Sequence, residues 1–230
     1  MSDQAPAAEA VEQAIRSRRA VRAFLPDPVD PALVRRLLEL AAQAPSGTNM
    51  QPWKVRVLGP QSRERLESAL IEALDDPEFK PEEEYRYYPK TFAEPYLSRR
   101  RKVGWDLYGL LGVVKGDREG ARRHVAYNLR FFGAPVALMV TIDRSLEIGS
   151  WLDLGMFLQN LLIAAQGHGL DSCPQAIFAQ FHPVVREVLA IPEEEIVVCG
   201  IALGHADWSA PANRLVPERE PVESFTTWLD

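Results

Sequence analysis

Cysteine and histidine are scarce in this chain. Its 230 residues include two cysteines, Cys173 and Cys199, and neither belongs to a Cys-x-x-Cys pair of the kind that binds zinc or exchanges disulfides. The four histidines stand singly, and no His-Glu-x-x-His motif occurs. We therefore expect free thiols in a reducing compartment, no disulfide framework and no metal site.

A targeting segment and long apolar runs are also lacking. The opening Met1-Ser2-Asp3-Gln4 has neither the basic flank nor the apolar core of a signal peptide. The longest apolar runs, such as residues 134–142, are too short to span a bilayer. The expected location is the cytoplasm, with no membrane partner.

Positive charge is not in excess, since the formal net charge is −6 at pH 7. Affinity for nucleic acid comes from accumulated Lys and Arg contacts with phosphates, so we expect no nucleic-acid partner. Two local basic clusters remain, one at residues 16–22 and one at residues 99–102. The second is typical of a solvated face.

Motifs of side-chain catalysis and nucleotide binding are missing as well. The chain has no Gly-x-Gly-x-x-Gly, no Gly-x-x-x-x-Gly-Lys-Ser/Thr and no Gly-x-Ser-x-Gly. We therefore expect no catalytic side chain, and the chemistry is better assigned to a bound cofactor that the protein holds and tunes.

The residues that are present indicate one globular unit, with 47% apolar and 25% charged residues. Helices and strands interleave in a three-layer pattern. Apolar periodicity predicts the following elements: strands near 53–57, 134–142 and 196–203, and helices over 8–17, from 30 to just before Pro45, and over 62–74, 151–166 and 183–189. The helix at 151–166 is apolar almost all round, which predicts burial, either within the chain or against a second subunit.

Residues 75–120 differ in character from the rest. Four prolines interrupt this stretch, and aromatic residues, among them Tyr85, Tyr88 and Phe92, crowd it. We predict a single domain over residues 1–230 with this segment as an insertion. It is either a static subdomain packed by its own aromatics or a lid over a substrate.

The first basic cluster suggests an anion site. Guanidinium groups offer paired donors and a permanent charge, which suit a phosphomonoester, and Arg18 and Arg22 lie close together in a short loop. Asn49 and Gln51 add amide donors and acceptors suited to the edge of a heterocycle.

Two segments in the first quarter of the chain resemble the N-terminal signatures of the FMN-dependent nitroreductase family. They are Arg18-Arg19-Ala20-Val21-Arg22-Ala23-Phe24 and Ala44-Pro45-Ser46-Gly47-Thr48-Asn49-Met50-Gln51-Pro52-Trp53. Residues 170–176, 200–204 and 213–219 also resemble that family in order and spacing, so the likeness covers nearly the whole chain. The segment at residues 75–120, called the middle segment below, resembles that of nitrobenzoate-type nitroreductases.

The resemblance implies a fold and an assembly. It implies an α+β, three-layer sandwich in which helices flank a central mixed, mostly antiparallel sheet. It also implies a homodimer with one FMN in each of two clefts at the subunit interface.

The resemblance carries roles over to individual residues. Arg18, Arg22 and Arg219 match positions that bind the flavin phosphate, with Arg19 and Ala20 along the same loop, where the family often has Ser or Thr in place of Ala20. Positions that reach the flavin from the other subunit are matched by Pro45, Ser46, Gly47 and Asn49, and Gln51 is a candidate in addition to them. Positions beside the isoalloxazine edge are matched by Pro174, Gln175 and Ala176. The last two cofactor-binding candidates are Gly204, at the end of the last strand, and Arg130, near flavin N1 and O2.

The implied activity is ping-pong hydride transfer from NADH or NADPH through FMN to a nitroaromatic or similar electron-poor aromatic. One alternative is a reductive dehalogenase resembling iodotyrosine deiodinase, whose lid clamps an amino acid. The middle segment offers Glu84, Tyr88 and Lys90 as residues of the types that such a clamp uses. A second alternative is a protein that stores or senses FMN without turnover.

Overall fold

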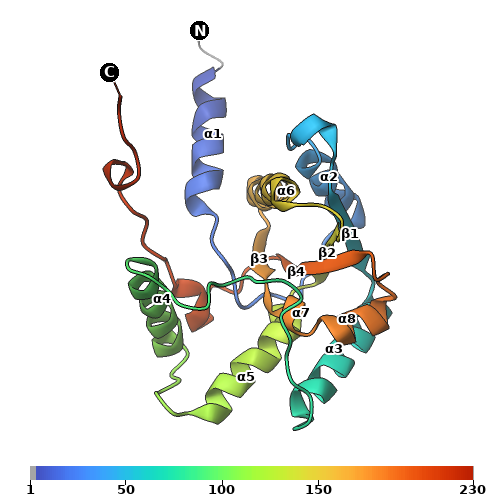
Figure 1. Ribbon diagram of the computed structural model, residues 1–230. Coiled ribbons are helices and arrows are strands. Elements are labelled where there is room, and N and C mark those ends of the chain that lie inside the picture. Colours follow the sequence, from blue (N-terminus) through green and yellow to red (C-terminus); the bar gives the residue numbers. More distant parts are fainter. Residues whose placement is uncertain (1–3, 230) are drawn as a thin grey trace.

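A four-stranded sheet lies at the centre of the computed structural model, which describes residues 4–229 (Figure 1). The strand order is β1 (Trp53–Leu58), β2 (Val136–Asp143), β4 (Glu195–Gly204) and β3 (Asp171–Gln175), and all neighbouring strands are antiparallel. One isolated parallel bridge joins Ala20 to Ser172 at the β3 edge. The predicted sandwich with a mostly antiparallel sheet is confirmed.

Helices α2 (Pro31–Ala41) and α6 (Ile148–Gly167) cover one face of the sheet. The Asp30 carboxylate caps α2 by accepting a 2.8 Å hydrogen bond from the N–H of Ala32, which satisfies one of the free donors at the helix start. Phe157 of α6 stacks on Trp53 of β1 with 4.9 Å between ring centroids. This face therefore carries one of two hydrophobic layers.

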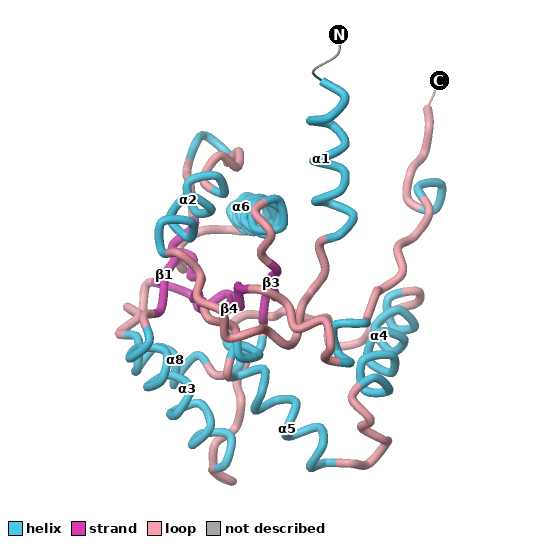
Figure 2. The backbone as a smooth tube through the Cα atoms, turned by 180° about the vertical axis from the view of Figure 1, so that it is seen from behind, coloured by secondary structure: helices cyan, strands magenta, loops and turns pink. Residues whose placement is uncertain are grey.

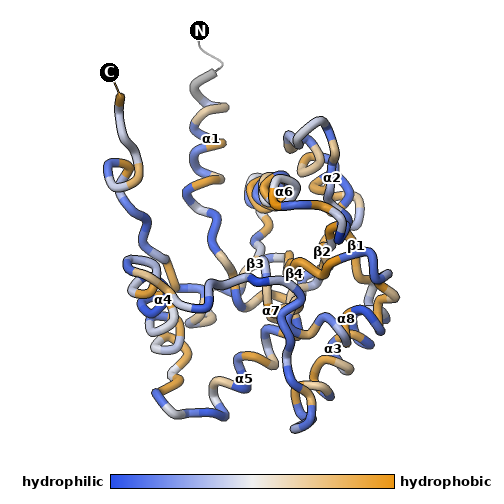
Figure 3. The backbone as a smooth tube through the Cα atoms, viewed as in Figure 1, coloured by the Kyte–Doolittle hydropathy of each residue, from blue (hydrophilic) through white to orange (hydrophobic). Residues whose placement is uncertain are grey.

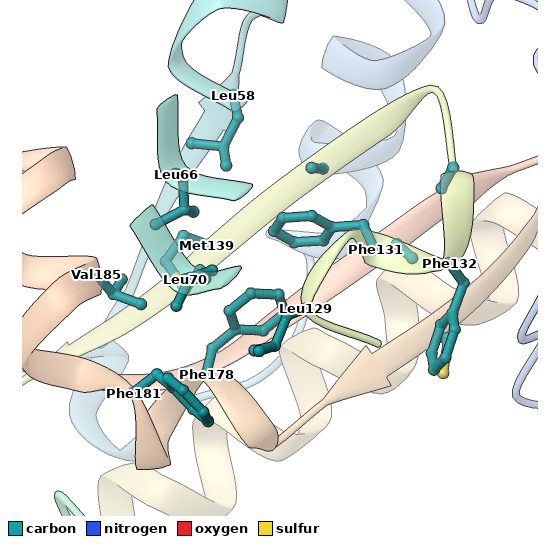
Figure 4. Close-up of a cluster of buried hydrophobic side chains, with 14 of the residues drawn as sticks. Leu58, Leu66, Leu70, Leu129, Phe131, Phe132, Met139, Phe178, Phe181 and Val185 are labelled. Atoms are coloured by element: carbon teal, nitrogen blue, oxygen red, sulfur yellow. The ribbon is translucent and has the colours of Figure 1, made fainter. Parts of the chain in front are cut away.

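The other face is covered by α3 (Pro60–Asp75), α5 (Arg118–Leu129), α7 (Ile177–Gln180) and α8 (His182–Leu189). Figure 4 shows the core here, in which Phe131 and Phe178 stack at 4.5 Å. Gly200 of β4 has no room for a Cβ, because the rings of Phe178 and Phe131 lie against it. Close packing of aromatics on the sheet explains a glycine inside a buried strand.

Helix α6 is buried on one side only. Leu154, Phe157 and Leu161 face the sheet, whereas Ile148 and Leu152 are exposed within a single chain. Among the described helices, α6 is the one that is long and apolar enough to cross a membrane, with 20 residues and a mean hydropathy of 1.3. The uninterrupted apolar runs of the sequence alone did not predict this. Its packing on the sheet accounts for it as a core helix.

Two segments project from the same side of the body, as Figures 1 and 2 show: α1 (Gln4–Ser17) and the end of the chain. The C-terminal segment leaves a 3₁₀ turn (Pro211–Arg214) and passes α4 (Tyr96–Leu110), where Arg99 pairs with Glu220 at 2.8 Å. Beyond a second turn (Val222–Ser224), Phe225, Trp228 and Leu229 are exposed, and Figure 3 shows hydrophobic colour at this tip.

Candidate cofactor-binding site

Residues 18–24 follow α1 as an extended segment beside the β3 edge of the sheet. The N–H of Val21 donates a 3.0 Å hydrogen bond to the carbonyl of Ser172, and Phe24 forms an antiparallel bridge with Ala206. The side chains of Val21 and Phe24 are buried in the core, whereas Arg18 and Arg22 are half-buried. The apolar residues of the motif thus anchor the segment and leave its arginines at the surface of the site.

Arg18 and Arg22 both lie near enough to the Cys173 thiol to act on it, and Arg219 lies near enough to Arg18 for its charge to act on that guanidinium. Burial lowers the pKa of Arg18, and the positive charge of Arg219 lowers it further. Burial raises the pKa of the Cys173 thiol to about 11, although Arg22 and Arg18 both act against this shift. Within residues 4–229, none of these three arginines forms an ion pair with a carboxylate. The cluster is therefore a concentrated positive charge without its own counter-ion.

Arg19 and Ala20 lie in the same segment, but their side chains do not belong to the arginine cluster. The guanidinium of Arg19 stacks over Trp208 at 5.2 Å from the ring centroid, and its charge acts on the nearby Asp171. Ala20 contributes a backbone carbonyl, which accepts a 3.2 Å hydrogen bond from Nη1 of Arg22. Arg19 therefore has a packing partner of its own.

Gln175 ends β3 and is buried. Its Nε2 donates two hydrogen bonds of 2.7 Å to Asn128, one to the backbone carbonyl and one to Oδ1. Its Oε1 is buried without a hydrogen-bond partner, a rare state for a polar atom in a folded protein. On either side of Gln175, Pro174 is exposed and Ala176 half-buried.

The loop at residues 45–51 lies between α2 and β1, apart from the arginine cluster. Thr48, Asn49 and Gln51 adopt left-handed backbone conformations, with φ of 48°, 62° and 49°. The N–H of Gly47 donates to the buried Asp153 of α6 at 3.1 Å, and Oγ of Ser46 accepts from the N–H of Gln51 at 3.0 Å. These bonds hold an unusual backbone in place. Pro45, Asn49 and Gln51 are exposed.

The two groups of candidate residues lie at opposite edges of one sheet. The arginine cluster sits beside β3, and the 45–51 loop leads into β1, with β2 and β4 between them. A single chain therefore does not bring the loop to the arginines.

Arg130 and Gly204 complete the predicted set. Arg130 is exposed at the C-terminal end of α5, two residues after the Asn128 that holds Gln175, and its side chain makes no hydrogen bond or ion pair within the described residues. Gly204 is buried at the end of β4, where the ring of Pro135 leaves no room for a Cβ. Close packing therefore explains Gly204 without a ligand.

The middle segment is fixed at its base. The carboxylate of Glu84, with 2% of its side chain exposed, binds Arg144 at 2.6 Å, Arg186, and the N–H of Val197 at 2.8 Å. Tyr85 donates a 2.8 Å hydrogen bond from its hydroxyl to the carbonyl of Val198. These contacts cover the half of β4 that β3 does not reach, and so protect a strand edge.

Beyond this base the segment is exposed and aromatic. Successive rings contact one another from Tyr87 to Tyr88 at 4.6 Å and from Tyr88 to Phe92 at 5.6 Å. The guanidinium of Arg100 in α4 lies 5.3 Å from the ring of Tyr88 and 4.9 Å from that of Phe92. These aromatics pack mainly on each other and on one cation.

Sequence reasoning missed three polar residues that hold the candidate residues in place: Asn128, which accepts from Gln175, Asp153, which accepts from Gly47, and Asn213, whose Oδ1 accepts a 2.6 Å hydrogen bond from the N–H of Arg22. Asn213 lies in a segment that resembles the family pattern, but the resemblance assigned no role to this residue. Asn128 and Asp153 had no signal, because each acts on a residue that is distant in sequence.

Comparison with known proteins identifies the family. Residues 15–205 match the model of the Nitroreductase family. The chain belongs to this family. It is 40% identical to a chloronitrobenzene nitroreductase of Comamonas testosteroni, over 97% of this chain and 99% of that protein, and 40% identical to a 4-nitrobenzoate reductase of Pseudomonas putida, over 94% and 93%.

Solved structures of nitroreductases share the fold. The FMN and NADPH-dependent nitroreductase NfnB from sphigopyxis sp. strain HMH superposes with a TM-score of 0.91 at 37% identity, covering 96% of this chain and 99% of that one. The FMN-dependent NfnB from Mycobacterium smegmatis, in complex with NADPH, superposes with a TM-score of 0.92 at 33% identity, over 97% and 100%. The nitroreductase fold of this chain is thereby established.

Proposed function

We propose that this nitroreductase uses FMN to pass hydride from NADH or NADPH to nitroaromatic acceptors. The observation that carries the proposal is the group of three arginines without a counter-ion. A dianionic phosphate is the ligand that such a cluster of guanidinium groups suits best. Relatives along nearly the full chain are named as chloronitrobenzene and nitrobenzoate reductases, which supports a nitroaromatic acceptor.

The residues present fit FMN. Arg18, Arg22 and Arg219 would hold its phosphate, and the unpartnered Oε1 of Gln175 would accept a hydrogen bond from a donor on the flavin ring. A buried acceptor without a partner costs free energy, and a bound ligand that donates to it removes this cost. FMN, when bound, supplies the hydride chemistry that no set of side chains in this chain provides.

We also propose that the active form is a homodimer. The loop at residues 45–51 would contribute to the flavin site of the partner subunit, because within one chain a full sheet width separates it from the arginines. The exposed apolar residues of α6, among them Leu152, favour burial against a second copy. In such a dimer Pro45, Ser46, Gly47, Asn49 and Gln51 complete the site built by the arginines of the other chain.

The roles of the remaining candidates follow in this proposal. Ala20, Pro174 and Ala176 would offer backbone and apolar contacts to the flavin. Arg130 would approach its N1 and O2 edge, and Gly204 and Arg19 would shape the strand end and loop. We further propose that residues 1–230 form one domain with an insertion at about 75–120, and that the protein resides in the cytoplasm.

The dehalogenase alternative loses its main candidate residue. A lid that clamps an amino acid needs a free carboxylate, but Glu84 is buried between Arg144 and Arg186. Nothing in the described residues favours a storage protein over an enzyme.

A combined assay tests the proposal. The purified protein should show flavin absorption bands, and it should oxidise NADH or NADPH at a rate that rises when 4-nitrobenzoate is added. A halotyrosine should give no such rise. Absence of flavin bands after FMN is supplied would refute the cofactor, and flavin without any acceptor-dependent oxidation would support the storage protein instead.

A further inference from the structure

The buried side chain of Asn213 makes three hydrogen bonds to backbone groups near the arginine cluster. Its side chain is 1% exposed, and it lies in the 3₁₀ turn that precedes Arg219. Its Oδ1 accepts a 2.6 Å hydrogen bond from the backbone N–H of Arg22. Its Nδ2 donates to the carbonyls of Ala23 and Asp207, each at 2.8 Å.

Two of these bonds, to Arg22 and Ala23, join parts of the chain that are 191 and 190 positions apart, and the third holds Asn213 to Asp207 within its own part of the chain. Ala23 and Arg22 belong to the arginine segment, whereas Asp207 belongs to the segment after β4 that leads on to Arg219. The amide of Asn213 has one acceptor oxygen and one donor nitrogen with two hydrogens, so these contacts use both of its hydrogens. Neither a carboxylate nor an apolar side chain of the same size satisfies all three backbone groups.

We propose that Asn213 is a positioning residue of the phosphate site: it fixes the backbone of the Arg18–Arg22 segment against the segment that carries Arg219. Like charges repel: burial lowers the pKa of Arg18 most, and the positive charge of Arg219 lowers it further. Before an anion binds, the protein must therefore hold these cations together by other contacts. The hydrogen bonds of Asn213 do so through backbone groups alone and use no donor of the three guanidinium groups. Pre-organisation of this kind raises affinity by lowering the cost of ordering the site.

The inference rests on the proposed FMN function, and its test separates the two. FMN and riboflavin differ by the phosphate, so a residue that organises the phosphate site changes the ratio of their dissociation constants. For Asn213→Leu, which keeps the size of the side chain but none of its hydrogen bonds, we expect FMN binding to weaken by about tenfold or more. Riboflavin binding should change by less than about twofold, which is within the scatter expected for a distant ligand group. Flavin fluorescence quenching on the full-length chain measures both constants.

Two further variants sharpen the test. Asn213→Ser is smaller and keeps one polar group, so it decides the question if Asn213→Leu does not fold. Thr141→Val is the matched control, because Thr141 is fully buried and hydrogen-bonded to Glu195 at the other end of the sheet. It should lower stability and leave the ratio of the two dissociation constants unchanged.

A double variant tests whether Asn213 acts through Arg22. If it does, Asn213→Ser combined with Arg22→Ala should weaken FMN binding by less than the product of the two single effects. The inference would be overturned if the Asn213 variants lose FMN and riboflavin affinity equally, or lose neither, and Arg22→Ala still weakens FMN binding. If Arg22→Ala and Arg219→Ala also leave FMN binding unchanged, the phosphate site itself is wrong.

Discussion

Arg22 and Arg219 present a strict test of the candidate site at the scale of single residues, because almost the whole sequence separates them and both are proposed to bind one phosphate. Removing one charged partner of a phosphate should cost about 1.5–3 kcal/mol, or roughly ten- to a hundredfold in FMN affinity. We expect this loss for Arg22→Ala and for Arg219→Ala, with riboflavin affinity hardly changed. The double variant should show a non-additive loss, since both residues serve one ligand group.

The matched control for these two variants is Arg16→Ala. Arg16 is exposed on α1 and pairs with Glu12 at 3.6 Å, so its removal should leave FMN affinity unchanged. Isothermal titration of each variant with FMN and with riboflavin measures the effect. Unchanged FMN affinity in both single variants would remove the assignment of the phosphate site.

The lowered pKa of Glu195 predicts how the free energy of unfolding depends on pH. Burial of this carboxylate acts to raise its pKa, but hydrogen bonds from Arg56 at 2.8 Å and Thr141 at 2.5 Å, together with the positive charges of Arg56 and Lys54, outweigh burial and lower the pKa below its ordinary value of 4.5. A depressed folded-state pKa gives stability that is present above the unfolded value and is lost as the pH falls through the folded one.

We therefore expect Glu195→Gln to lower the free energy of unfolding by about 1–3 kcal/mol at pH 7. The gap between the variant and the parent protein should narrow as the pH falls below about 4.5. Urea unfolding at several pH values measures this gap. Glu39→Gln, which removes an exposed pair with Arg36, should have little effect at any pH, and a gap for Glu195→Gln that does not vary with pH would contradict the prediction.

At the scale of elements, the middle segment divides into a fixed base and an exposed aromatic part. Glu84 and Tyr85 fasten the base to β4 and α8, whereas residues 87–94 contact mainly one another and Arg100. We therefore propose that the exposed part is the portion that selects acceptors. We expect replacement of residues 87–94 by a short Gly/Ser linker to change the ratio of kcat/KM between nitrobenzene and 4-nitrobenzoate severalfold, with FMN still bound.

Two variants at the base provide the contrast. Glu84→Gln should lower the free energy of unfolding by roughly 1.5–3 kcal/mol, because it weakens charged hydrogen bonds to Arg144, Arg186 and Val197. Glu83→Gln, at an exposed neighbouring position, should have almost no effect. Loss of FMN or wholesale unfolding on replacing residues 87–94 would instead indicate a static subdomain.

At the scale of the whole molecule, the exposed apolar face of α6 and the separation of the two groups of candidate residues both support the proposed homodimer. Leu152 of α6 is 70% exposed, and an acidic side chain there would place an unpaired charge in the proposed interface. We expect Leu152→Asp to produce monomers in sedimentation experiments and to lose FMN along with the dimer.

Val114→Asp is the matched control, because Val114 is 72% exposed in the turn after α4, away from α6. This variant should remain a dimer with bound flavin. A parent protein that sediments as a stable monomer while retaining FMN would exclude the composite site.

The sequence alone determined the main elements and the residue types of the candidate site. Buried strands at 136–143 and 195–204 follow from continuous apolar runs, and Asp30 and Pro31 define the start of α2, because these signals are local in the chain. The arginine segment and the 45–51 loop were recognisable for the same reason. The short strand β3 and the four-residue helix α7 were not predicted, because segments of this length carry too little periodicity.

Only the tertiary structure decided which of these residues meet. It brought Arg219 near enough to Arg18 for its charge to act on that residue, set the 45–51 loop at the opposite edge of the sheet, and used Glu84 as a buried anchor. It also revealed Asn213, whose contacts join the two ends of the chain. Such contacts depend on packing and on hydrogen bonds between segments far apart in sequence, and no local pattern of residues encodes which partner a buried polar group will find.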